Sequence, residues 1–457
     1  MPIEEFPITQ SGGTRVPHSV AIGPNRWLWV TTDNKSLVQI SRSDPSAQTV
    51  FTDLIPTYSA GILKDPKDRK VVWFASPAGP QDYDPIYEFD VEELRIINKH
   101  NLQDDARAQT IATVRIKTDP NNPSAPKKDY ILFAEPVYTS VGYVEVGKNG
   151  ASFHALPKEE PGFNTWLWSV TATVDPTETK FTYWATGQQH DRPARTTNGL
   201  YTFTPADDNA AWRRIPMPGG QIPIHIIAGD VTEDGEKKTY LWISARNPNR
   251  ILRYDVKDKS WKQSQEITGE PRQLAFGPDN LIWVAGSDKI YRFRKNDAIT
   301  LVPSPSLPPG SEANAICIDD RDKVVWYTNR PAKKIGKYPI PEDGKSVLGK
   351  TQLVVQPTTS VAPGDIAEVP LVASFVAGAN AIPGIPLTCR ITSEETTFLD
   401  GTRECVIETD VTGEVTFPAV HAGKVEEEAV LKIGWGDNEP PTTVILNVRN
   451  EPEDNGA

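Results

Sequence analysis

The sequence of 457 residues predicts an all-β protein in which a seven-bladed β-propeller precedes a smaller β-sandwich. The first observation is a short phrase, a bulky residue followed by mostly small or apolar ones, which occurs seven times. The second is the separation of successive copies, about 41 to 59 residues, which is typical of four-stranded blades with variable loops. The third is a composition with 41 prolines and 31 glycines, which predicts many short strands and turns.

Each copy of the phrase predicts one strand of a blade. The copies begin at Trp29, Trp73, Leu132, Trp184, Trp242, Trp283 and Trp326. A second strand is expected after each of them, at 37–40, 86–89, 142–146, 200–203, 251–254, 290–293 and 335–338. Because a blade packs only on its neighbours, a propeller can hold roughly 300 to 350 residues as one domain. The repeats therefore predict a single propeller over residues 1–345.

The N-terminal segment is expected to close the ring. Residues 5–9, Glu-Phe-Pro-Ile-Thr, match the proline-containing pattern of the outer strands at 154–157 and 214–218. A seam between the first and last blades would otherwise leave strand edges with unpaired backbone groups. We therefore expect the N-terminal strand to be the outermost strand of blade seven, beside residues 311–340.

A second domain is expected after the turn-rich link at 341–345. Strands are predicted at 351–355, 367–373, 387–391, 405–409, 430–435 and 443–448, at spacings typical of a sandwich. Residues 382–389, Ile-Pro-Gly-Ile-Pro-Leu-Thr-Cys, and 399–402, Leu-Asp-Gly-Thr, resemble bacterial immunoglobulin-like modules. The resemblance implies an immunoglobulin-like β-sandwich over 351–450 that acts as a spacer or contacts a protein or glycan. The acidic residues 451–457 are expected to be a solvated tail.

Charge and hydropathy exclude several classes of protein. The net charge of −12, without a basic cluster, argues against a nucleic-acid partner. No stretch approaches the roughly 20 apolar residues of a membrane span, and the first residues lack the features of a signal peptide, so we expect no membrane association and a cytoplasmic location. Cys317 is expected in the core, whereas Cys389 and Cys405 either pair across a hairpin or stay reduced.

Two blades share a longer phrase. Residues 17–24, Pro-His-Ser-Val-Ala-Ile-Gly-Pro, precede 29–32, and residues 271–278, Pro-Arg-Gln-Leu-Ala-Phe-Gly-Pro, precede 283–286. Over residues 1–340 the phrase resembles the streptogramin B lyase (virginiamycin B lyase) family. The resemblance implies opening of a depsipeptide ester by elimination, with a histidine as acid or base and a divalent metal such as magnesium to offset developing charge.

The residues that carry this chemistry in the family are replaced. The family's two histidines and one glutamate correspond here to Arg272, Asn314 and Asn329. Neutral amides act neither as a general base nor as an anionic metal ligand at pH 7. We therefore expect a lyase-like propeller that binds, and either transforms or only holds, a small polar or cyclic molecule. The alternative is a non-catalytic propeller that binds a glycan or protein.

Aligning the blades predicts which side chains face the central channel. The first position of the inner strand contributes His18, Ala60, Val114, Val170, His225, Arg272 and Asn314. The last position of the recurring phrase contributes Thr32, Ser76, Glu135, Gly187, Ala245, Gly286 and Asn329. The polar residues of this set cluster on blades five to seven and one. They do not repeat from blade to blade, as the sites of a lectin would, which favours one small-molecule site.

Each candidate has two interpretations. His18 and His225 either act as acid, base or metal ligand, or hydrogen-bond a neighbouring strand. Arg272 suits a ligand carboxylate or phosphate, or an ion pair within the ring. Glu135 either joins a charged cluster with Arg272 or is an ordinary solvated carboxylate. Asn314 and Asn329 are expected to contact the ligand.

Blade four departs most from the repeat. Its long loop at 188–195 contains His190 beside Asp191, which is either a proton-transfer pair on a recognition rim or part of a plain surface loop. Trp166 and Trp168 either stack on a ring or sugar of the ligand, or pack between blades.

Overall fold

The computed structural model comprises two compact units, residues 1–340 and 341–457. It describes residues 3–10, 13–24, 27–33, 36–52, 61–67, 69–75, 86–101, 108–119, 121–122, 124–136, 139–156, 165–189, 198–205, 211–233, 236–295, 298–302, 304–340, 350–355, 360–367, 370–377, 380–381, 386–410, 414–434 and 442–449. Their regular secondary structure is strand apart from one 3₁₀ turn, Pro218–Gly220. Among these residues no helix has the length and hydropathy needed to cross a bilayer.

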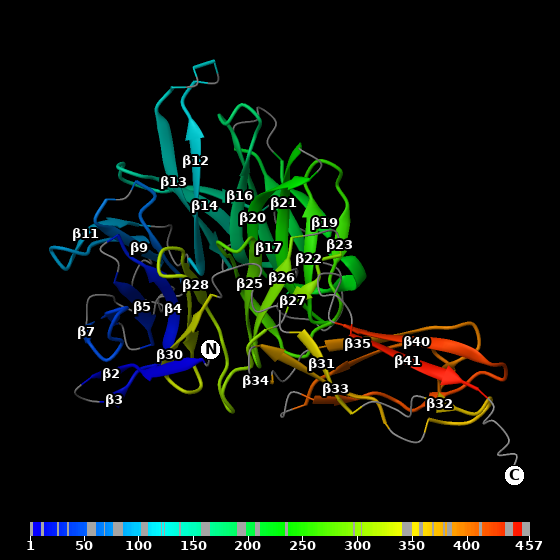
Figure 1. The fold of residues 1–457 in the computed structure, drawn as a ribbon. Helices are drawn as coiled ribbons and strands as arrows, with labels where there is room; N and C mark the ends of the chain where they lie inside the picture. The colour runs from blue at the N-terminus through cyan, green and yellow to red at the C-terminus, as the bar shows by residue number, and fades with distance from the viewer. Residues whose placement is uncertain are drawn as a thin grey trace, which may run out of the picture. The chain divides into compact units, whose positions relative to one another are not determined.

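Seven four-stranded antiparallel sheets build residues 1–340 (Figure 1). Blades one to three consist of β4 (Pro17–Ile22), β5 (Leu28–Thr32), β6 (Leu37–Ile40) and β7 (Gln48–Phe51); β8 (Gly61–Lys64), β9 (Val71–Ala75), β10 (Ile86–Asp90) and β11 (Arg95–His100); and β12 (Thr110–Lys117), β13 (Lys127–Glu135), β14 (Ser140–Glu145) and β15 (Ser152–Ala155). Blades four and five consist of β16 (Thr165–Val174), β17 (Phe181–Gln189), β18 (Gly199–Phe203) and β19 (Arg213–Pro216); and β20 (Ile222–Glu233), β21 (Glu236–Arg246), β22 (Arg250–Asp255) and β23 (Trp261–Gln263). Blade six consists of β24 (Pro271–Phe276), β25 (Leu281–Gly286), β26 (Ile290–Arg294) and β27 (Leu301–Val302). Blade seven consists of β28 (Ile316–Asp319), β29 (Val324–Asn329), β30 (Lys334–Pro339) and the N-terminal β1 (Glu4–Pro7), while β2 (Thr9–Gln10) and β3 (Gly13–Thr14) form a small hairpin.

The blades form a closed ring because each inner strand contacts the inner strands of the next and preceding blades, from β4 through β28 and back to β4. Seven hydrophobic clusters lie at the seven interfaces between blades. The bulky residue of the recurring phrase lies on the second strand of every blade, and Trp29, Trp73 and Trp242 are among the fully buried ones. The all-β prediction with propeller blades is confirmed.

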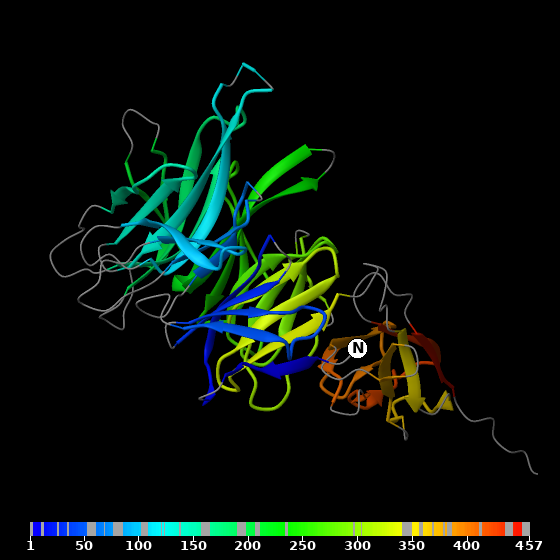
Figure 2. The ribbon, with the colours of Figure 1, turned by 90° about the vertical axis from the view of Figure 1, so that its left-hand side faces the viewer.

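The N-terminal strand β1 closes blade seven by pairing antiparallel with β30, with Phe6 opposite Ile335. Figure 2 shows this blue strand beside the yellow strands of the last blade. Ile8, just beyond β1, is fully buried in the interface between blades seven and one. The N-terminus thus supplies the fourth strand of blade seven, whose other three strands come from the end of the propeller sequence.

The Glu5 side chain on β1 is only 4% exposed, yet its carboxylate is fully hydrogen-bonded. Oε1 accepts from the Tyr327 hydroxyl at 2.7 Å and from the Asn329 amide at 2.8 Å. Oε2 accepts from the Ser311 hydroxyl at 3.1 Å and from Lys334 Nζ at 3.4 Å. A buried carboxylate is tolerated only with such partners, so Glu5 fixes the position of β1 in the seam. Burial and this contact together raise the pKa of Tyr327 above its usual range.

The second unit contains two larger sheets. One consists of β31 (Lys350–Val355), β33 (Val372–Ala377), β34 (Asn380–Ala381) and β38 (Glu414–Thr416). The other consists of β32 (Ser360–Val361), β41 (Thr442–Val448), β40 (Glu427–Gly434), β35 (Pro386–Thr392) and β37 (Glu404–Glu408), and a small pair consists of β36 (Thr397–Phe398) and β39 (Val420–His421). The strand expected at 367–373 begins five residues later, at Val372, where the pairing of β33 with β31 and β38 starts. Cys389 and Cys405 face each other across β35 and β37 as free thiols. Residues 451–457 and the first half, 382–385, of the immunoglobulin-like motif at 382–389 lie outside the described residues.

Candidate functional site

A cavity of about 470 Å³ opens where the inner strands begin, and we call it the axial cavity. It is lined by His18, Ser19, Gly61, Ile62, Thr110, Ile111, Trp168, Gln188, Ile224, His225, Arg246, Glu270, Arg272, Gln273, Asn314, Ala315 and Arg330. The four charged residues in the described lining come from blades five to seven, whereas blades two and three contribute Gly61, Ile62, Thr110 and Ile111. The predicted polarity of one wall is thus present, and His18, Trp168, His225, Arg272 and Asn314 come together.

A β-bulge at the start of the inner strand aims several of these side chains inward. In blades one, four, five and six the pairing with the second strand slips by one residue. Bulges re-aim side chains and increase local twist. The bulge places His18, Trp168, Ile224 and Arg272 at the cavity, and Asn314 lies just before β28 in blade seven.

Three of these bulge residues, His18, Ile224 and Arg272, accept a hydrogen bond at their backbone carbonyl from a hydroxyl on the second strand of the preceding blade. In blade five, the Ser244 hydroxyl accepts a hydrogen bond from the backbone N–H of His225 at 3.1 Å. The same hydroxyl donates to the carbonyl of Arg272 in blade six, at 2.5 Å. Thr186 and Thr328 stand two residues after their tryptophans, as Ser244 does, and likewise donate to the next blade, to the carbonyls of Ile224 and His18. We call this bond the hydroxyl clip; it fixes neighbouring cavity residues relative to one another.

The structure corrects the second half of the predicted channel set. Thr32, Glu135, Ala245 and Asn329 are fully buried between strands, and neither they nor Gly187 and Gly286 line the axial cavity. The residue after each of these positions faces the cavity in blades four, five and seven, as Gln188, Arg246 and Arg330. A shift of one residue along a strand moves every side chain to the opposite face. Sequence reasoning therefore missed these three residues by one position, and Ser76 and His190 lie outside the described residues.

Two inner-strand predictions also change. Val114 and Val170 are buried valines that lie deeper along their strands than His18 does along its own. In blade four the bulge at Trp168 brings that residue to the axial cavity, whereas in blade three, whose pairing is regular, the first residue of the inner strand, Thr110, reaches it. Trp168 is half-buried with its ring 5.6 Å from that of Trp166, and its indole borders the cavity.

Both histidines of the cavity are neutral at physiological pH. Burial lowers the pKa of His225 to about 4. Its Nδ1 accepts a hydrogen bond from the backbone N–H of Leu274 at 3.3 Å, which places the ring proton on Nε2. Burial, assisted by the positive charge of Arg330 and opposed by Asp33, lowers the pKa of His18 to about 4. A general base works best with a pKa near the operating pH, so His225 is suited to donate a hydrogen bond and not to abstract a proton.

Arg272 is held by two partners from blade seven. One guanidinium nitrogen donates to Oδ1 of Asn314, and the other contacts Oε2 of Glu312 at 2.6 Å. Asn329 does not reach the cavity: its amide nitrogen donates to Glu5, and its oxygen accepts from the backbone N–H groups of Glu312 and Ala332. Asn329 is thus a residue of the seam that positions Glu312 and, through it, Arg272.

The lining does not suit the divalent metal that the resemblance implies. Mg²⁺ prefers several oxygen ligands, most of them carboxylates and waters. Within the described part of the lining, Glu270 is the one carboxylate, and it pairs with Arg246 at 3.1 Å. Three arginines share the same cavity and would repel a cation. Among the residues described here, no group of three or more histidine, cysteine, aspartate or glutamate residues could hold a metal.

A second cavity of about 660 Å³ opens farther along the inner strands. Ile62, Ile111, His225 and Gln273 line both cavities. The charges of the second cavity include Arg42, which contacts Asp319 and lies 2.9 Å from Asp322. Burial raises the pKa of Cys317 in its wall, which disfavours the thiolate form.

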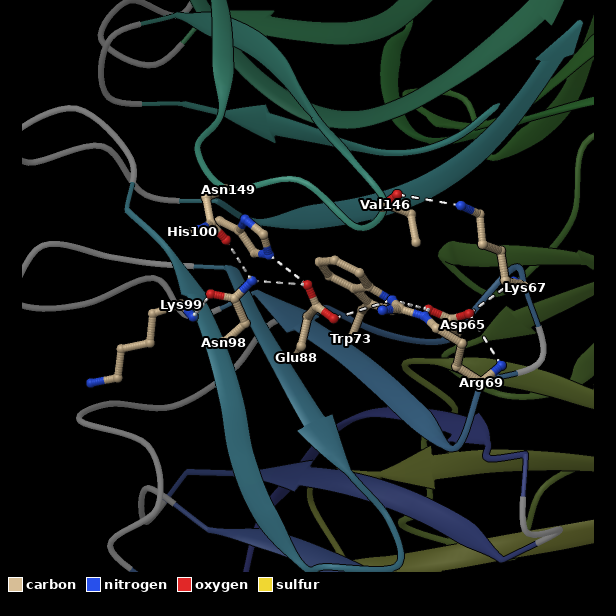
Figure 3. Close-up of polar contacts among 10 residues, drawn as sticks. All are labelled: Asp65, Lys67, Arg69, Trp73, Glu88, Asn98, Lys99, His100, Val146 and Asn149. Carbon is tan, nitrogen blue, oxygen red and sulfur yellow. Dashed lines mark hydrogen bonds and ion pairs between the residues drawn. The ribbon is translucent and has the colours of Figure 1, made fainter. Parts of the chain in front are cut away.

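Blade two contains a separate polar cluster, shown in Figure 3. Buried Glu88 accepts from His100 Nε2 at 2.8 Å and lies 3.1 Å from Arg69, which also contacts Asp65 at 2.6 Å. The indole of Trp73 donates to Asp65 at 2.8 Å. Because two carboxylates meet these donors within one blade, the cluster stabilises blade two around Trp73. Asp65, Arg69, Glu88 and His100 are not among the residues that line the axial cavity.

Comparison with solved structures identifies propellers as similar folds. A catalytically inactive variant of virginiamycin B lyase from Staphylococcus aureus, solved with quinupristin, is 18% identical with a TM-score of 0.51, covering 73% of this chain and 98% of that one. A streptogramin B lyase structure is 15% identical with a TM-score of 0.51, covering 73% and 96%. The Cps50 (Swd1) propeller domain of Myceliophteria thermophila is 10% identical with a TM-score of 0.50, covering 74% and 100%. In sequence, the chain matches no protein-family model and no curated protein. The lyases and the Swd1 domain have nearly equal TM-scores. The likeness is therefore one of propeller fold.

Proposed function

We propose that residues 1–340 bind a small molecule in the axial cavity without the elimination chemistry of the streptogramin lyases. The observation that carries the proposal is the convergence of non-repeating polar side chains from blades one and four to seven on one cavity. A cavity of this size, with an apolar wall and a few polar groups, is typical of small-molecule sites. The neutral histidines, the replaced family residues and the poor fit to a metal all favour binding over turnover.

A thermal-shift screen of the full-length protein against a small-molecule library tests this function. A ligand that binds only the folded protein raises its melting temperature. Hits should lose their shift in an Ile224→Trp variant, which fills the cavity at a position where blade four already has Trp168. They should keep it in Ile445→Trp, at an exposed position of the second unit. Hits that shift both variants equally, or no hits at all, would contradict the proposal.

Quinupristin provides the test of the chemistry. We expect the intact depsipeptide to be recovered after incubation with the protein and magnesium, as measured by mass spectrometry. Ring opening that depends on His18 or His225 would show that the propeller is a lyase.

We also propose that residues 351–450 form an immunoglobulin-like β-sandwich that acts as a spacer or contacts a protein or glycan. Support comes from the four-stranded and five-stranded sheets, in which β31 lies against β40 and β41. A glycan array probed with the full-length protein tests the contact. Binding that is unchanged in Ile224→Trp would support a surface outside the axial cavity, and the absence of binding would leave the spacer role.

A further inference from the structure

We infer that the ligand of the axial cavity is a small amphipathic oxyanion, with its carboxylate or phosphate against blades five to seven and its apolar part against blades two to four. This inference rests on the proposed function and names the class of molecule that the cavity selects. It is carried by the direction of the hydrogen-bonding groups, by the balance of charge and by the apolar wall.

In blades five to seven, the amide and imidazole groups of the lining have their acceptor atoms occupied. Gln188 of blade four differs, because its amide nitrogen donates to the carbonyl of Pro223 and leaves the oxygen as an acceptor. The backbone N–H of Ile316 donates to Oε1 of Gln273 at 2.8 Å, and Arg272 donates to Oδ1 of Asn314. The backbone N–H of Leu274 donates to Nδ1 of His225. Backbone N–H and guanidinium groups can only donate, so they determine which atom of each side chain is the acceptor. The remaining polar atoms, the amide nitrogens of Gln273 and Asn314 and Nε2 of His225, are therefore donors.

Among the described charged residues of the lining and their ion-pair partners, cations exceed carboxylates by one. Glu312 pairs with Arg272 at 2.6 Å, and Glu270 pairs with Arg246 at 3.1 Å. Arg330 lines the cavity as well, and the structure assigns it no carboxylate partner among the described residues. A positive cavity is unexpected in a protein of net charge −12. Donors and an excess cation together suit an oxyanion, because guanidinium groups bind carboxylate and phosphate with charge-assisted hydrogen bonds.

The opposite wall is mainly apolar. Gly61, Ile62 and Ile111 line it from blades two and three, and Trp168 adds an indole from blade four. An aromatic ring gains hydrophobic and stacking energy against such a surface. The two walls therefore orient one molecule, with its anion and its ring at opposite ends.

Four probes with one ring system separate these contributions: 2-naphthoate, 2-naphthyl phosphate, 2-naphthamide and 2-naphthylmethylamine, measured by ligand-observed NMR and calorimetry on the full-length protein. We expect at least one of the two anions to bind about tenfold more tightly than the amide, and the amine to bind most weakly. The preferred anion shows whether the natural ligand is a carboxylate or a phosphate.

The Arg330→Gln variant should weaken the binding of the preferred anion about tenfold and that of the amide by less. Arg213→Gln, the same change at an exposed arginine of β19, is the matched control and should change neither. Amide or amine binding as tight as that of both anions, with all binding lost in Ile224→Trp, would overturn the oxyanion inference while the proposed function stands. The absence of binding by every probe would also overturn the oxyanion inference, whereas probe binding that persists in Ile224→Trp would overturn the proposed function itself.

Discussion

The seam and the axial cavity use similar hydrogen-bond donors toward different ends. At the seam, donors from Ser311, Tyr327, Asn329 and Lys334 surround a carboxylate that the chain itself supplies, Glu5. In the axial cavity, donors converge on space that a ligand can enter. The same chemistry thus contributes stability where the carboxylate is attached to the chain, and affinity where it must come from solution.

The two regions are neighbours through Asn329. Its amide nitrogen donates to Glu5, while its oxygen accepts from the backbone N–H of Glu312 at 3.4 Å. Glu312 in turn pairs with Arg272 in the axial cavity. The closure of the ring therefore helps to position one wall of the cavity.

Removal of residues 1–9 from the full-length protein is expected to have the largest effect on the seam. It removes the β1 pairing, the buried Ile8 and the carboxylate of Glu5. The free energy of unfolding of the propeller should fall by about 5 kcal/mol, measured by urea denaturation. Removal of residues 451–457 is the control, and an unchanged urea midpoint after removal of residues 1–9 would contradict the closing role of the strand.

The Glu5→Gln variant removes the buried negative charge of the seam and keeps the size of the side chain. The amide should cost about 2 kcal/mol in the free energy of unfolding, because it cannot accept from all four donors. Probe affinity in the axial cavity should change little. Glu4→Gln is the matched control, since that carboxylate is 49% exposed and pairs with Lys337 at the surface. Equal free energies of unfolding for the two variants would show that the charge of Glu5 contributes nothing to stability.

Ser244→Ala tests the hydroxyl clip on the cavity side. Loss of its two hydrogen bonds should cost about 1 kcal/mol in stability and weaken probe binding several-fold, because His225 and Arg272 lose their common partner. Calorimetry with the preferred naphthyl probe measures the affinity. Ser244→Thr should restore it, since threonine occupies this position in blades one, four and seven. An alanine variant with full affinity would make the clip irrelevant to binding.

The pH dependence of unfolding should show the smallest effect. The pKa of His225, about 4 in the folded protein, lies below the ordinary value of about 6.5. Between these values the unfolded chain binds a proton that the native state does not, so stability falls as pH drops through this window. His225→Gln should reduce this proton uptake by about one proton, measured as the slope of unfolding free energy against pH. A slope equal to that of the wild type would mean that His225 is not held neutral.

Much of the propeller could be predicted because its signal repeats. The bulky residues at positions such as Trp29 and Trp326 mark a strand that must be buried on both faces, and every blade interface needs one. The candidate site was predicted less completely. His18, His225, Arg272, Asn314 and Trp168 reach the axial cavity, whereas Glu135 and Asn329 are buried behind it. The immunoglobulin-like identity of the second unit stays a prediction.

The amino-acid sequence by itself determined the all-β class and the positions of the blades, because hydrophobic periodicity and turn residues act locally and repeat. Only the tertiary structure decided which side chains face the axial cavity. A bulge of one residue exchanges the two faces of a strand, and the hydroxyl clips that hold the bulges join residues of neighbouring blades, such as Ser244 and Arg272. Contacts of this kind exist only once the ring has closed.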